Sequence, residues 1–467
     1  MSISAAVTEA RATGSGTREA RAVSLARRIA EQLFGPAEAR DFAIRYWDSG
    51  AADALVAAAP AVTLVLRHPA AFRRMLLPPS QLALTEAFVR GDVDVEGDLE
   101  AAAGLADRVR ARLATPGVLR HLLPLLIASP ATPAGPHAPR LAPARRGRDG
   151  RLHSPRRDAA AIRAHYDVGN AFYALWLDRR MVYSCAYFPT GAEDIDAAQE
   201  AKLELICRKL RLRPGDRLLD IGCGWGGLVL YAAERYGVTA TGVTLSPSQA
   251  EWARARAAEQ GLAERVRIEV RDYRALEGDG VFDKLASIGM CEHVGHRELG
   301  TYFAHAHRLL RPGGLFLNTC IVDQRERARA TWRDRLWHEG TFIDRYVFPD
   351  GELPRLGPML REAGRAGFET CDVESLREHY ALTLRRWVRR LEAAREQAVA
   401  EVGEPTYRVW RLYMAGSAYG FARGAMGLAQ ALLAKPEADG RVGLPLTRED
   451  LYAGRTGGRE DGRVAPR

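Results

Sequence analysis

The chain has 467 residues, of which 47% are hydrophobic and 27% charged, and this balance is typical of a globular protein with two or three domains. We expect no transmembrane helix and no secretory signal, and six scattered cysteines without a CxxC pair argue against a disulfide framework or a zinc site and fit a reducing cytoplasm. The net charge of +9 attracts nucleic acid and anionic lipid equally well, unless it reflects only a solvated arginine-rich surface.

The N-terminal part of the chain predicts a small α+β domain over residues 21–128, which we expect to dock at lipid. Residues 1–20 before it are rich in Ala, Arg, Gly, Ser and Thr and predict a disordered tail. A helix is expected from Ser24 to Phe34, where apolar residues recur every four positions. After it we expect a strand at residues 62–66 and a helix at 69–76. Residues 81–99 predict a helix that ends near Gly91, followed by a turn-rich acidic piece, and residues 100–128 predict one or two further helices.

A change of composition marks residues 129–158 as a linker, because a Pro- and Ala-rich segment followed by many arginines cannot bury a core. The arginines are Arg140, Arg145, Arg146, Arg148, Arg151, Arg156 and Arg157. They indicate either a flexible tether or a polybasic patch, in which each Arg contributes about 1 kcal/mol at an anionic membrane.

The third region, residues 159–435, alternates between apolar strand-like runs and helical stretches. This pattern predicts a parallel sheet covered by helices on both faces. The strands are expected at residues 217–221, 239–243, 266–270, 284–288 and 315–320. The remaining residues 436–467 are rich in Gly, Arg and Asp, and we expect a flexible tail.

A glycine-rich loop follows the first of these strands, in Asp220-Ile221-Gly222-Cys223-Gly224-Trp225-Gly226-Gly227. Glycines let a backbone pass close beneath a ligand, and the helix expected at 227–236 would point its N-terminus at that ligand. The loop fits the dinucleotide pattern GxGxxG only loosely, and the missing Lys-Ser/Thr excludes a P-loop. A tight structural turn is the alternative.

The next two strands also end in polar residues. Thr244, Ser246 and Gln249 stand where many nucleotide-binding sheets carry an acid, and they can hydrogen-bond the same ribose hydroxyls. After the following strand, Asp272 is a candidate acceptor for an adenine amino group, and Tyr273 is a candidate to lie along the ring.

Further motifs stand in order along the chain: His165-Tyr166-Asp167-Val168-Gly169-Asn170, Tyr183-Ser184-Cys185-Ala186-Tyr187-Phe188, the glycine-rich loop, Gly242-Val243-Thr244-Leu245-Ser246, Gly289-Met290-Cys291-Glu292-His293-Val294-Gly295 and Tyr346-Val347-Phe348-Pro349. With these motifs, about residues 60–430 resemble the cyclopropane fatty acid synthases, including the mycolic acid cyclopropane synthases. The resemblance implies the Rossmann-like sheet of class I methyltransferases and S-adenosylmethionine as cofactor. It assigns to the cofactor Tyr183, Ser184, Asp220, Gly222, Cys223, Gly224, Trp225, Gly226, Thr244, Leu245, Ser246, Gln249, Asp272 and Tyr273. For Tyr183 and Tyr187 the alternative is ordinary aromatic core.

The resemblance also implies a reaction, in which a methyl group is transferred to the cis double bond of an unsaturated phospholipid acyl chain and a cyclopropane ring closes. The alkene is the nucleophile, so the protein aligns the reactants, excludes water and stabilises a carbocation, which aromatic faces attract. Aromatic candidates are Tyr166, Tyr183, Phe188, Tyr302, Phe303 and Tyr380. In the family, a bicarbonate ion removes the proton, and its matching site residues here are Glu292, Tyr380, Cys185 and Ile321.

Two positions depart from the family pattern. Thr319 stands where the family usually carries a His, and Thr cannot carry charge or shuttle a proton near neutral pH, so bicarbonate binding stays open. The alternative products are a methyl- or methylene-branched chain. Ser417 replaces a Cys of some members, which matters little because the alkene is the nucleophile.

Other classes of protein remain in competition with this interpretation. A small-molecule methyltransferase would need a polar pocket, whereas Tyr302, Phe303, Trp332, Trp337, Phe342 and Tyr346 predict an apolar one. A non-catalytic lipid-binding homologue is a further alternative. We expect no nucleic-acid partner, because no Asn/Asp-Pro-Pro-Tyr/Phe motif follows the fourth strand. The expected partner is an anionic membrane surface on the cytoplasmic side of the inner membrane. Acyl length, headgroup and oligomeric state, with a homodimer as one option, stay open.

Overall fold

The structure is a computed structural model, and it describes residues 20–48, 60–76, 80–113, 115–128, 153–154, 156–158, 162, 165, 168–324, 342–348 and 350–452. The chain divides into two compact units. The first unit comprises Met1–Leu177, Asp323–Gly351 and Arg377–Gly427, and the second unit comprises Asp178–Val322, Glu352–Leu376 and Leu428–Arg467. Both units are thus assembled from separate stretches of chain and differ in composition from the predicted domains, whose boundaries remain predictions.

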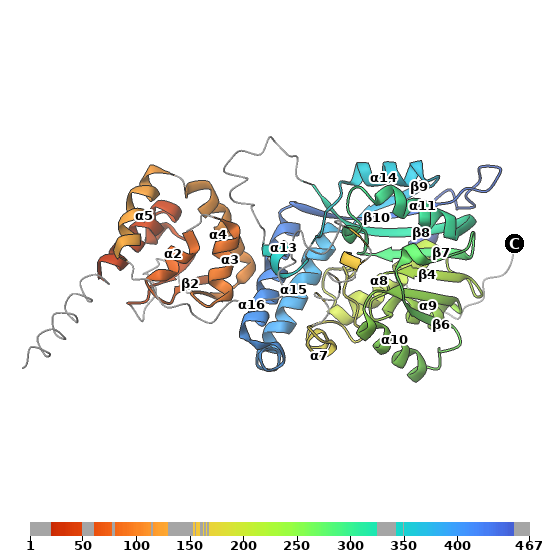
Figure 1. Cartoon of the computed structure of the whole chain (residues 1–467), viewed down its shortest axis with the longest axis horizontal. Coiled ribbons are helices and arrows are strands. Elements are labelled where there is room, and N and C mark those ends of the chain that lie inside the picture. Colours follow the sequence, from red (N-terminus) through yellow and green to blue (C-terminus); the bar gives the residue numbers. More distant parts are fainter. Residues whose placement is uncertain are drawn as a thin grey trace, which may run out of the picture. The chain divides into compact units, whose positions relative to one another are not determined.

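The second unit contains a seven-stranded sheet in the order β6-β5-β4-β7-β8-β10-β9 (Figure 1). Its strands are β4 (Arg217–Ile221), β5 (Thr239–Thr244), β6 (Val266–Val270), β7 (Phe282–Ile288), β8 (Leu310–Asp323), β9 (Glu369–Ser375) and β10 (Met426–Ala434). The five predicted strands are confirmed as β4 to β8, and they pair in parallel. The prediction of a purely parallel sheet is incomplete, because β10 and β9 extend it as an antiparallel pair.

Helices cover both faces of this sheet, as predicted. Successive residues of β4 point to opposite faces, so Leu218 packs in a core with α8 (Ile195–Leu210) and α9 (Gly227–Tyr236), while Leu219 packs in a second core with α11 (Leu299–Leu309). The remaining elements of this unit are α10 (Pro247–Glu259), α14 (Leu356–Arg365), α17 (Glu449–Tyr452) and the 3₁₀ turns η2 (Tyr273–Ala275) and η3 (Cys291–His293). The carboxyl ends of β4, β5, β6 and β7 therefore meet at one edge of a sheet that is covered on both faces.

The first unit contains a three-stranded sheet in the order β1-β2-β3. Its elements are η1 (Ala37–Ala39), β1 (Ala43–Arg45), β2 (Val62–Leu66), α2 (Ala70–Leu76), α3 (Gln81–Val89), β3 (Val93–Gly97), α4 (Leu99–Arg112), α5 (Pro116–Ala128), α7 (Asn170–Ala174), α13 (Phe342–Tyr346), α15 (Arg377–Ala393) and α16 (Arg395–Ala422), with a helix at residues 20–34 before them. The expected helices and the strand at 62–66 are confirmed. The expected turn-rich acidic piece is wrong, because it contains strand β3, in which buried Val93 and Val95 alternate with acidic residues.

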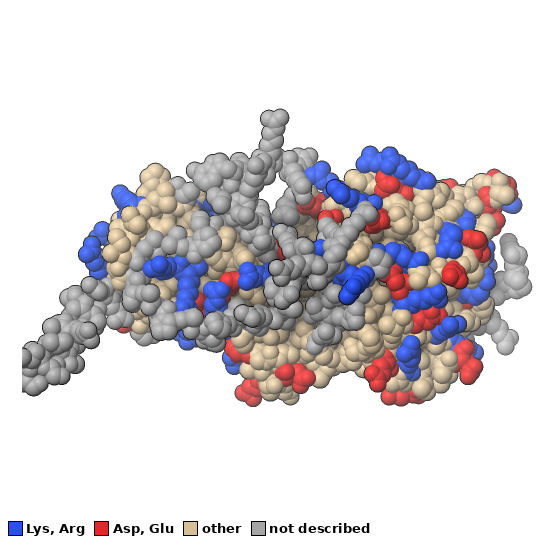
Figure 2. Space-filling view, viewed as in Figure 1, with Lys and Arg blue, Asp and Glu red and all other residues tan. Residues whose placement is uncertain are grey.

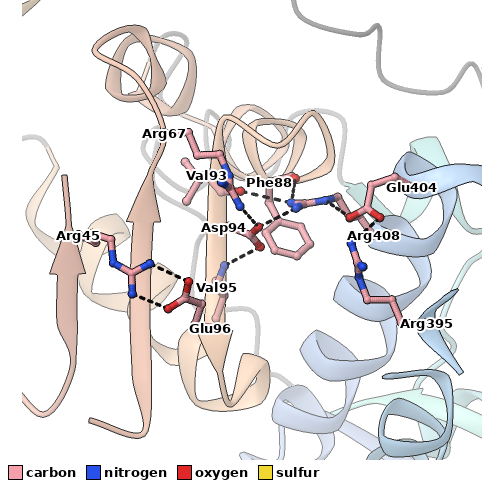
Figure 3. Close-up of polar contacts among 10 residues, drawn as sticks. All are labelled: Arg45, Arg67, Phe88, Val93, Asp94, Val95, Glu96, Arg395, Glu404 and Arg408. Atoms are coloured by element: carbon pink, nitrogen blue, oxygen red, sulfur yellow. Dashed lines mark hydrogen bonds and ion pairs between the residues drawn. The ribbon is translucent and has the colours of Figure 1, made fainter. Parts of the chain in front are cut away.

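The acidic residues of β3 are held by arginines from neighbouring elements (Figure 3). The carboxylate of Asp94 accepts hydrogen bonds from Arg67 at 2.8 Å and from the buried Arg408 of α16 at 2.8 Å. Burial opposes the ionisation of Asp94, yet the two guanidinium groups hold its pKa below the ordinary value. Arg408 also donates to the carbonyl of Phe88 at 2.9 Å. This contact set joins the N-terminal sheet to α16 inside the first unit.

In the part of the chain that the structure describes, helices are either too short or too polar to cross a membrane. All six cysteines lie in this part, and each is a free thiol.

Candidate active site

The glycine-rich loop lies at the carboxyl end of β4 and forms a turn that only glycine adopts easily. Gly222, Gly224 and Gly226 have φ angles of +86°, +53° and +81°. The amides of Gly222 and Cys223 both donate to the carbonyl of Val243, at 2.9 and 3.0 Å. The loop is thus fixed to β5 and presents its backbone at the sheet edge, at the N-terminus of α9.

Asp220 precedes the loop and is buried. Burial raises the pKa of its carboxyl to about 7, although the nearby Lys202 ammonium pulls it down. Among the described residues, Oδ1 of Asp220 has no hydrogen-bond partner. A buried acceptor without a partner is costly unless a ligand satisfies it.

Lys202, on α8, is a site residue that the sequence analysis missed. Its Nζ donates to Oγ of Ser184 at 3.0 Å. Burial lowers the pKa of this amine to about 8, and the carboxyls of Asp178 and Asp220 partly oppose that fall. Gln199, one turn earlier on α8, donates to the carbonyl of Ser184 at 2.8 Å. The helix therefore holds the predicted cofactor-binding Ser184 by its side chain and its backbone.

A signal for these residues was present in the sequence. Gln199 and Lys202 share a helical face with the buried Leu203, Ile206 and Leu210, so they are polar residues on an apolar stripe. Such residues need a partner inside the protein. A helical pattern alone does not identify that partner.

The polar residues after β5 form a small hydrogen-bonded group. Thr244 donates to Oε1 of Gln249 at 2.8 Å, and Ser246 caps α10 by accepting from the Gln249 amide at 3.4 Å. Gln249 is buried, and among the described residues its Nε2 has no partner. Leu245 lies between them and is half-buried. Gln249 therefore offers a donor at this edge, as Asp220 offers an acceptor.

Asp272 and Tyr273 follow β6, where the sequence placed them. Both carboxylate oxygens of Asp272 accept hydrogen bonds from the Arg274 guanidinium, at 2.9 and 2.6 Å. The ring of Tyr273 meets Tyr302 edge-on, with 5.6 Å between centroids. An adenine amino group could contact Asp272 only if it shared the carboxylate with Arg274. The predicted contact between Asp272 and adenine stays a prediction.

Glu292 lies in η3, just after β7, and it is brought together with Ile321 of β8. Its Oε1 accepts a hydrogen bond from the backbone amide of Ile321 at 2.7 Å. Its Oε2 is buried and has no partner among the described residues. Burial raises the pKa of the Glu292 carboxyl to about 7, although the hydrogen bond from the Ile321 amide lowers this pKa in part. The thiol of Cys185, also buried, lies 3.2 Å from the carbonyl oxygen of Ala186 and 3.8 Å from that of Leu376.

Thr319, which the resemblance matches to the family His, has its hydroxyl engaged inside the second unit. Nε2 of Gln430 donates to Oγ1 of Thr319 at 3.1 Å. Oε1 of the same Gln430 side chain accepts a hydrogen bond from Nζ of Lys209 at 2.7 Å. Lys209 also pairs with Glu374. Thr319 is thus part of a buried chain of polar groups across β8, β10 and β9. The fifth candidate, Tyr380, lies on α15 of the first unit, where its ring packs at a tilt against that of Phe421, with 4.6 Å between centroids.

The mycolic acid cyclopropane synthetase family model matches residues 153–431. The chain belongs to this family. It is therefore an S-adenosylmethionine-dependent methyltransferase, and the family groups it with lipid methyltransferases.

Similar proteins carry several different names. A probable fatty acid methyltransferase of Pseudomonas putida is 42% identical over 409 residues, which cover 88% of this chain and 95% of that protein. The cyclopropane-fatty-acyl-phospholipid synthase of Escherichia coli K12 is 37% identical, with 58% of this chain and 66% of that protein covered. The crystal structure of mycolic acid cyclopropane synthase CmaA1 with SAH and CTAB has a TM-score of 0.54 and 33% identity, and covers 59% of this chain and 97% of that one.

The residues present suit the cofactor that the family implies. S-adenosylmethionine carries ribose hydroxyls, which need an acceptor, and a charged amino-acid part, which needs donors and acceptors. Asp220 Oδ1 and Gln249 Nε2 are buried atoms of these two kinds without partners among the described residues. The three positive-φ glycines of the loop add backbone that carries no Cβ at this edge. The carboxyl edge of β4 and β5 therefore fits this cofactor, and the residues assigned to it stay a prediction.

Two of the aromatic candidates lie in the core. Tyr302 and Phe303 of α11 are fully buried and pack with Phe316 and Phe368 beneath the sheet, and Tyr302 donates to Asn318 at 2.8 Å. The prediction that these two rings line the substrate pocket is wrong, because both ring faces are buried in the hydrophobic core. Tyr346 belongs to the first unit, where its hydroxyl donates to Glu86 at 2.8 Å. Three further candidates lie outside the described residues: Tyr166, Trp332 and Trp337.

Proposed function

We propose that this enzyme transfers the methyl group of S-adenosylmethionine to the cis double bond of an unsaturated acyl chain in a membrane phospholipid, and that a cyclopropane ring then closes. The observation that carries the proposal is the buried Glu292 carboxyl, which lies at the carboxyl edge of the cofactor sheet with Oε2 unpartnered among the described residues. Membership of a lipid methyltransferase family supports the substrate class.

When bound, S-adenosylmethionine supplies an electrophilic methyl group. The π electrons of the alkene form the new carbon–carbon bond, and positive charge develops on the second alkene carbon. A proton then leaves the new methyl group, and the electrons of that C–H bond close the ring onto the cationic carbon. The protein has to exclude water from this cation and to accept one proton.

We infer that Glu292 accepts this proton. Its pKa of about 7 makes the carboxylate available near neutral pH while keeping it a stronger base than an ordinary Glu. The family resemblance implies that bicarbonate is the base and that the backbone amide of residue 321 donates a hydrogen bond to it. Here that amide already donates to Glu292, and position 319 is Thr rather than His. Both observations favour direct action of Glu292, so we expect turnover in bicarbonate-free buffer.

A second product is favoured by one observation. Thr319 has no group that ionises near neutral pH, so it cannot supply the charge that a His would, and its hydroxyl already accepts a hydrogen bond from Gln430. If the cation moves by a hydride shift before proton loss, the same methyl transfer yields a methylene branch instead of a ring. The name of the Pseudomonas relative, a fatty acid methyltransferase, is compatible with either product.

Lipid analysis tests this proposal. The gene is expressed in a host without its own enzyme of this kind, and fatty acid methyl esters are compared by gas chromatography–mass spectrometry with cyclopropane and branched standards. We expect cyclopropane chains one methylene unit heavier than their unsaturated precursors. Only branched products would overturn ring closure, and an unchanged lipid profile would favour the non-catalytic lipid-binding alternative.

The substrate places the enzyme at a membrane surface, and we propose peripheral binding at the inner face of the cytoplasmic membrane. The arginine-rich linker was one candidate for this contact, but most of it lies outside the described residues. Arg157 is used elsewhere, because it forms a bidentate pair with Asp350 at 2.7 and 2.8 Å in which both side chains are largely buried. Arg157 is therefore unsuited to contact lipid headgroups.

A further inference from the structure

Helix α5 carries an apolar stripe on its exposed side. Leu119, Leu123 and Ile127 are spaced four residues apart, so they lie along one face of the helix. Their exposed fractions are 50%, 65% and 80%. Among the described residues, the other exposed large hydrophobic side chains are Val270, Leu446 and Tyr452, all in the second unit. Single exposed apolar residues are ordinary, but a continuous stripe marks an interaction surface.

The inner side of α5 already satisfies the core of the first unit. Val118, Leu122 and Leu125 are buried in the main hydrophobic cluster of that unit. At its N-terminus, α5 packs against the helix of residues 20–34, where a Cβ added to Gly117 would overlap the side chain of Gln32. The outer leucines and Ile127 are therefore not needed to fold the unit, and the helix is apolar on two faces.

Positive charge borders this stripe. Helix α5 contains Arg120 and His121 and no acidic residue. Arg120 donates a hydrogen bond to Nε2 of His121 at 3.1 Å, and burial, Arg120 and Arg28 of the helix of residues 20–34 all lower the pKa of His121. Figure 2 shows the surface over α5 largely without charge, with blue arginine side chains at its borders. A stripe of aliphatic side chains edged by arginines matches an anionic lipid surface in charge and in polarity.

We propose that α5 is the membrane-docking element of this enzyme, lying in the interface of an anionic phospholipid membrane with Leu119, Leu123 and Ile127 in the acyl region and Arg120 among the headgroups. This proposal rests on the proposed function, which requires access to acyl chains in a bilayer. An interfacial helix of this kind combines a buried apolar face with electrostatic attraction to anionic lipid.

Flotation of the full chain with vesicles tests the proposal. Wild type is mixed with vesicles of phosphatidylcholine and phosphatidylglycerol, or of phosphatidylcholine alone, without S-adenosylmethionine. The result is thus independent of catalysis, and a failure of the proposed reaction leaves it readable. The test variants are Leu123→Glu and the milder Ile127→Ser, and the matched control is Leu446→Glu, which makes the same change at an exposed leucine of the second unit.

We expect wild type and Leu446→Glu to float with anionic vesicles and to bind phosphatidylcholine weakly. Leu123→Glu should lower the apparent affinity about tenfold or more, because an apolar contact is lost and a carboxylate enters its place. Ile127→Ser should lower it less, with thermal unfolding unchanged for both. Undiminished flotation of both variants would overturn the proposal. The proposal would also be overturned if Leu123→Glu changed the sedimentation coefficient but not the binding to vesicles, since the stripe would then join two copies of the chain.

Discussion

Replacing Lys202 by Met removes a buried positive charge from the cofactor edge while keeping a side chain of similar length. In the structure, the Lys202 ammonium donates to Ser184 and helps to hold the pKa of Asp220 down. The variant loses both effects. We expect its main consequence at Asp220, because that carboxyl is buried and the Lys202 ammonium is the charge that lowers its pKa.

The magnitude follows from the charge lost. With Lys202 present, the pKa of Asp220 is about 7, so about half of this carboxyl is ionised at neutral pH. Losing an opposite charge in a buried site raises a carboxyl pKa by about 1 to 3 units. The ionised fraction at neutral pH then falls to about a tenth or less, and cofactor affinity falls about fivefold or more if only the carboxylate binds.

The assay is calorimetric titration with S-adenosylhomocysteine between about pH 6 and about pH 9. A carboxylate is lost as the pH falls through its pKa, so wild-type binding should weaken below about pH 7. In Lys202→Met, the same weakening should begin at about pH 8 or above.

The matched control is Ser184→Ala, which loses the hydrogen bond to Lys202 but keeps the charge. Its affinity should fall at every pH, and the midpoint should stay at the wild-type value. A Lys202→Met midpoint identical to that of wild type would refute the electrostatic link between Lys202 and Asp220.

Three further predictions follow from buried groups. Glu292→Gln should lower product formation about a hundredfold or more while S-adenosylhomocysteine affinity measured by calorimetry stays unchanged, and surviving turnover would remove Glu292 as the base. Asp220→Asn should gain thermal stability relative to wild type as the pH rises from about 5 to about 8, because wild type ionises a carboxyl whose pKa is raised by burial; a pH-independent difference in melting temperature would contradict this. Arg408→Leu should lower the free energy of unfolding in urea by about 3 kcal/mol, since it breaks a buried pair with Asp94, and a loss below about 1 kcal/mol would show that Arg67 suffices.

The sequence predicted the parallel part of the sheet well, because strands such as β4 and the central part of β8 contain apolar runs buried on both faces. The antiparallel strands β9 and β10 were not predicted, for two different reasons. The edge strand β9, Glu369–Ser375, is mostly polar and only partly buried. Its neighbour β10, Met426–Ala434, is rich in Ala and Leu, a composition equally typical of a helix. Tertiary pairing, rather than local propensity, decides both.

The site was predictable where chemistry follows a strand end. Asp220, the glycine loop and Glu292 occupy such positions, and parallel strands bring their carboxyl ends to one edge. The partners of these residues were not predictable. Lys202 reaches Ser184 from a helix face, and Gln430 reaches Thr319 from an unpredicted strand. These contacts depend on three-dimensional packing that no spacing in the chain records.

The most direct test of the account is turnover by the purified full chain on vesicles that differ only in their acyl chains. S-adenosylhomocysteine release is measured with anionic phospholipid carrying either cis-monounsaturated or fully saturated chains. The account predicts release with the unsaturated lipid, matched by an equal amount of cyclopropane product, and none above background with the saturated lipid. Equal release from both lipids would contradict an alkene as the methyl acceptor.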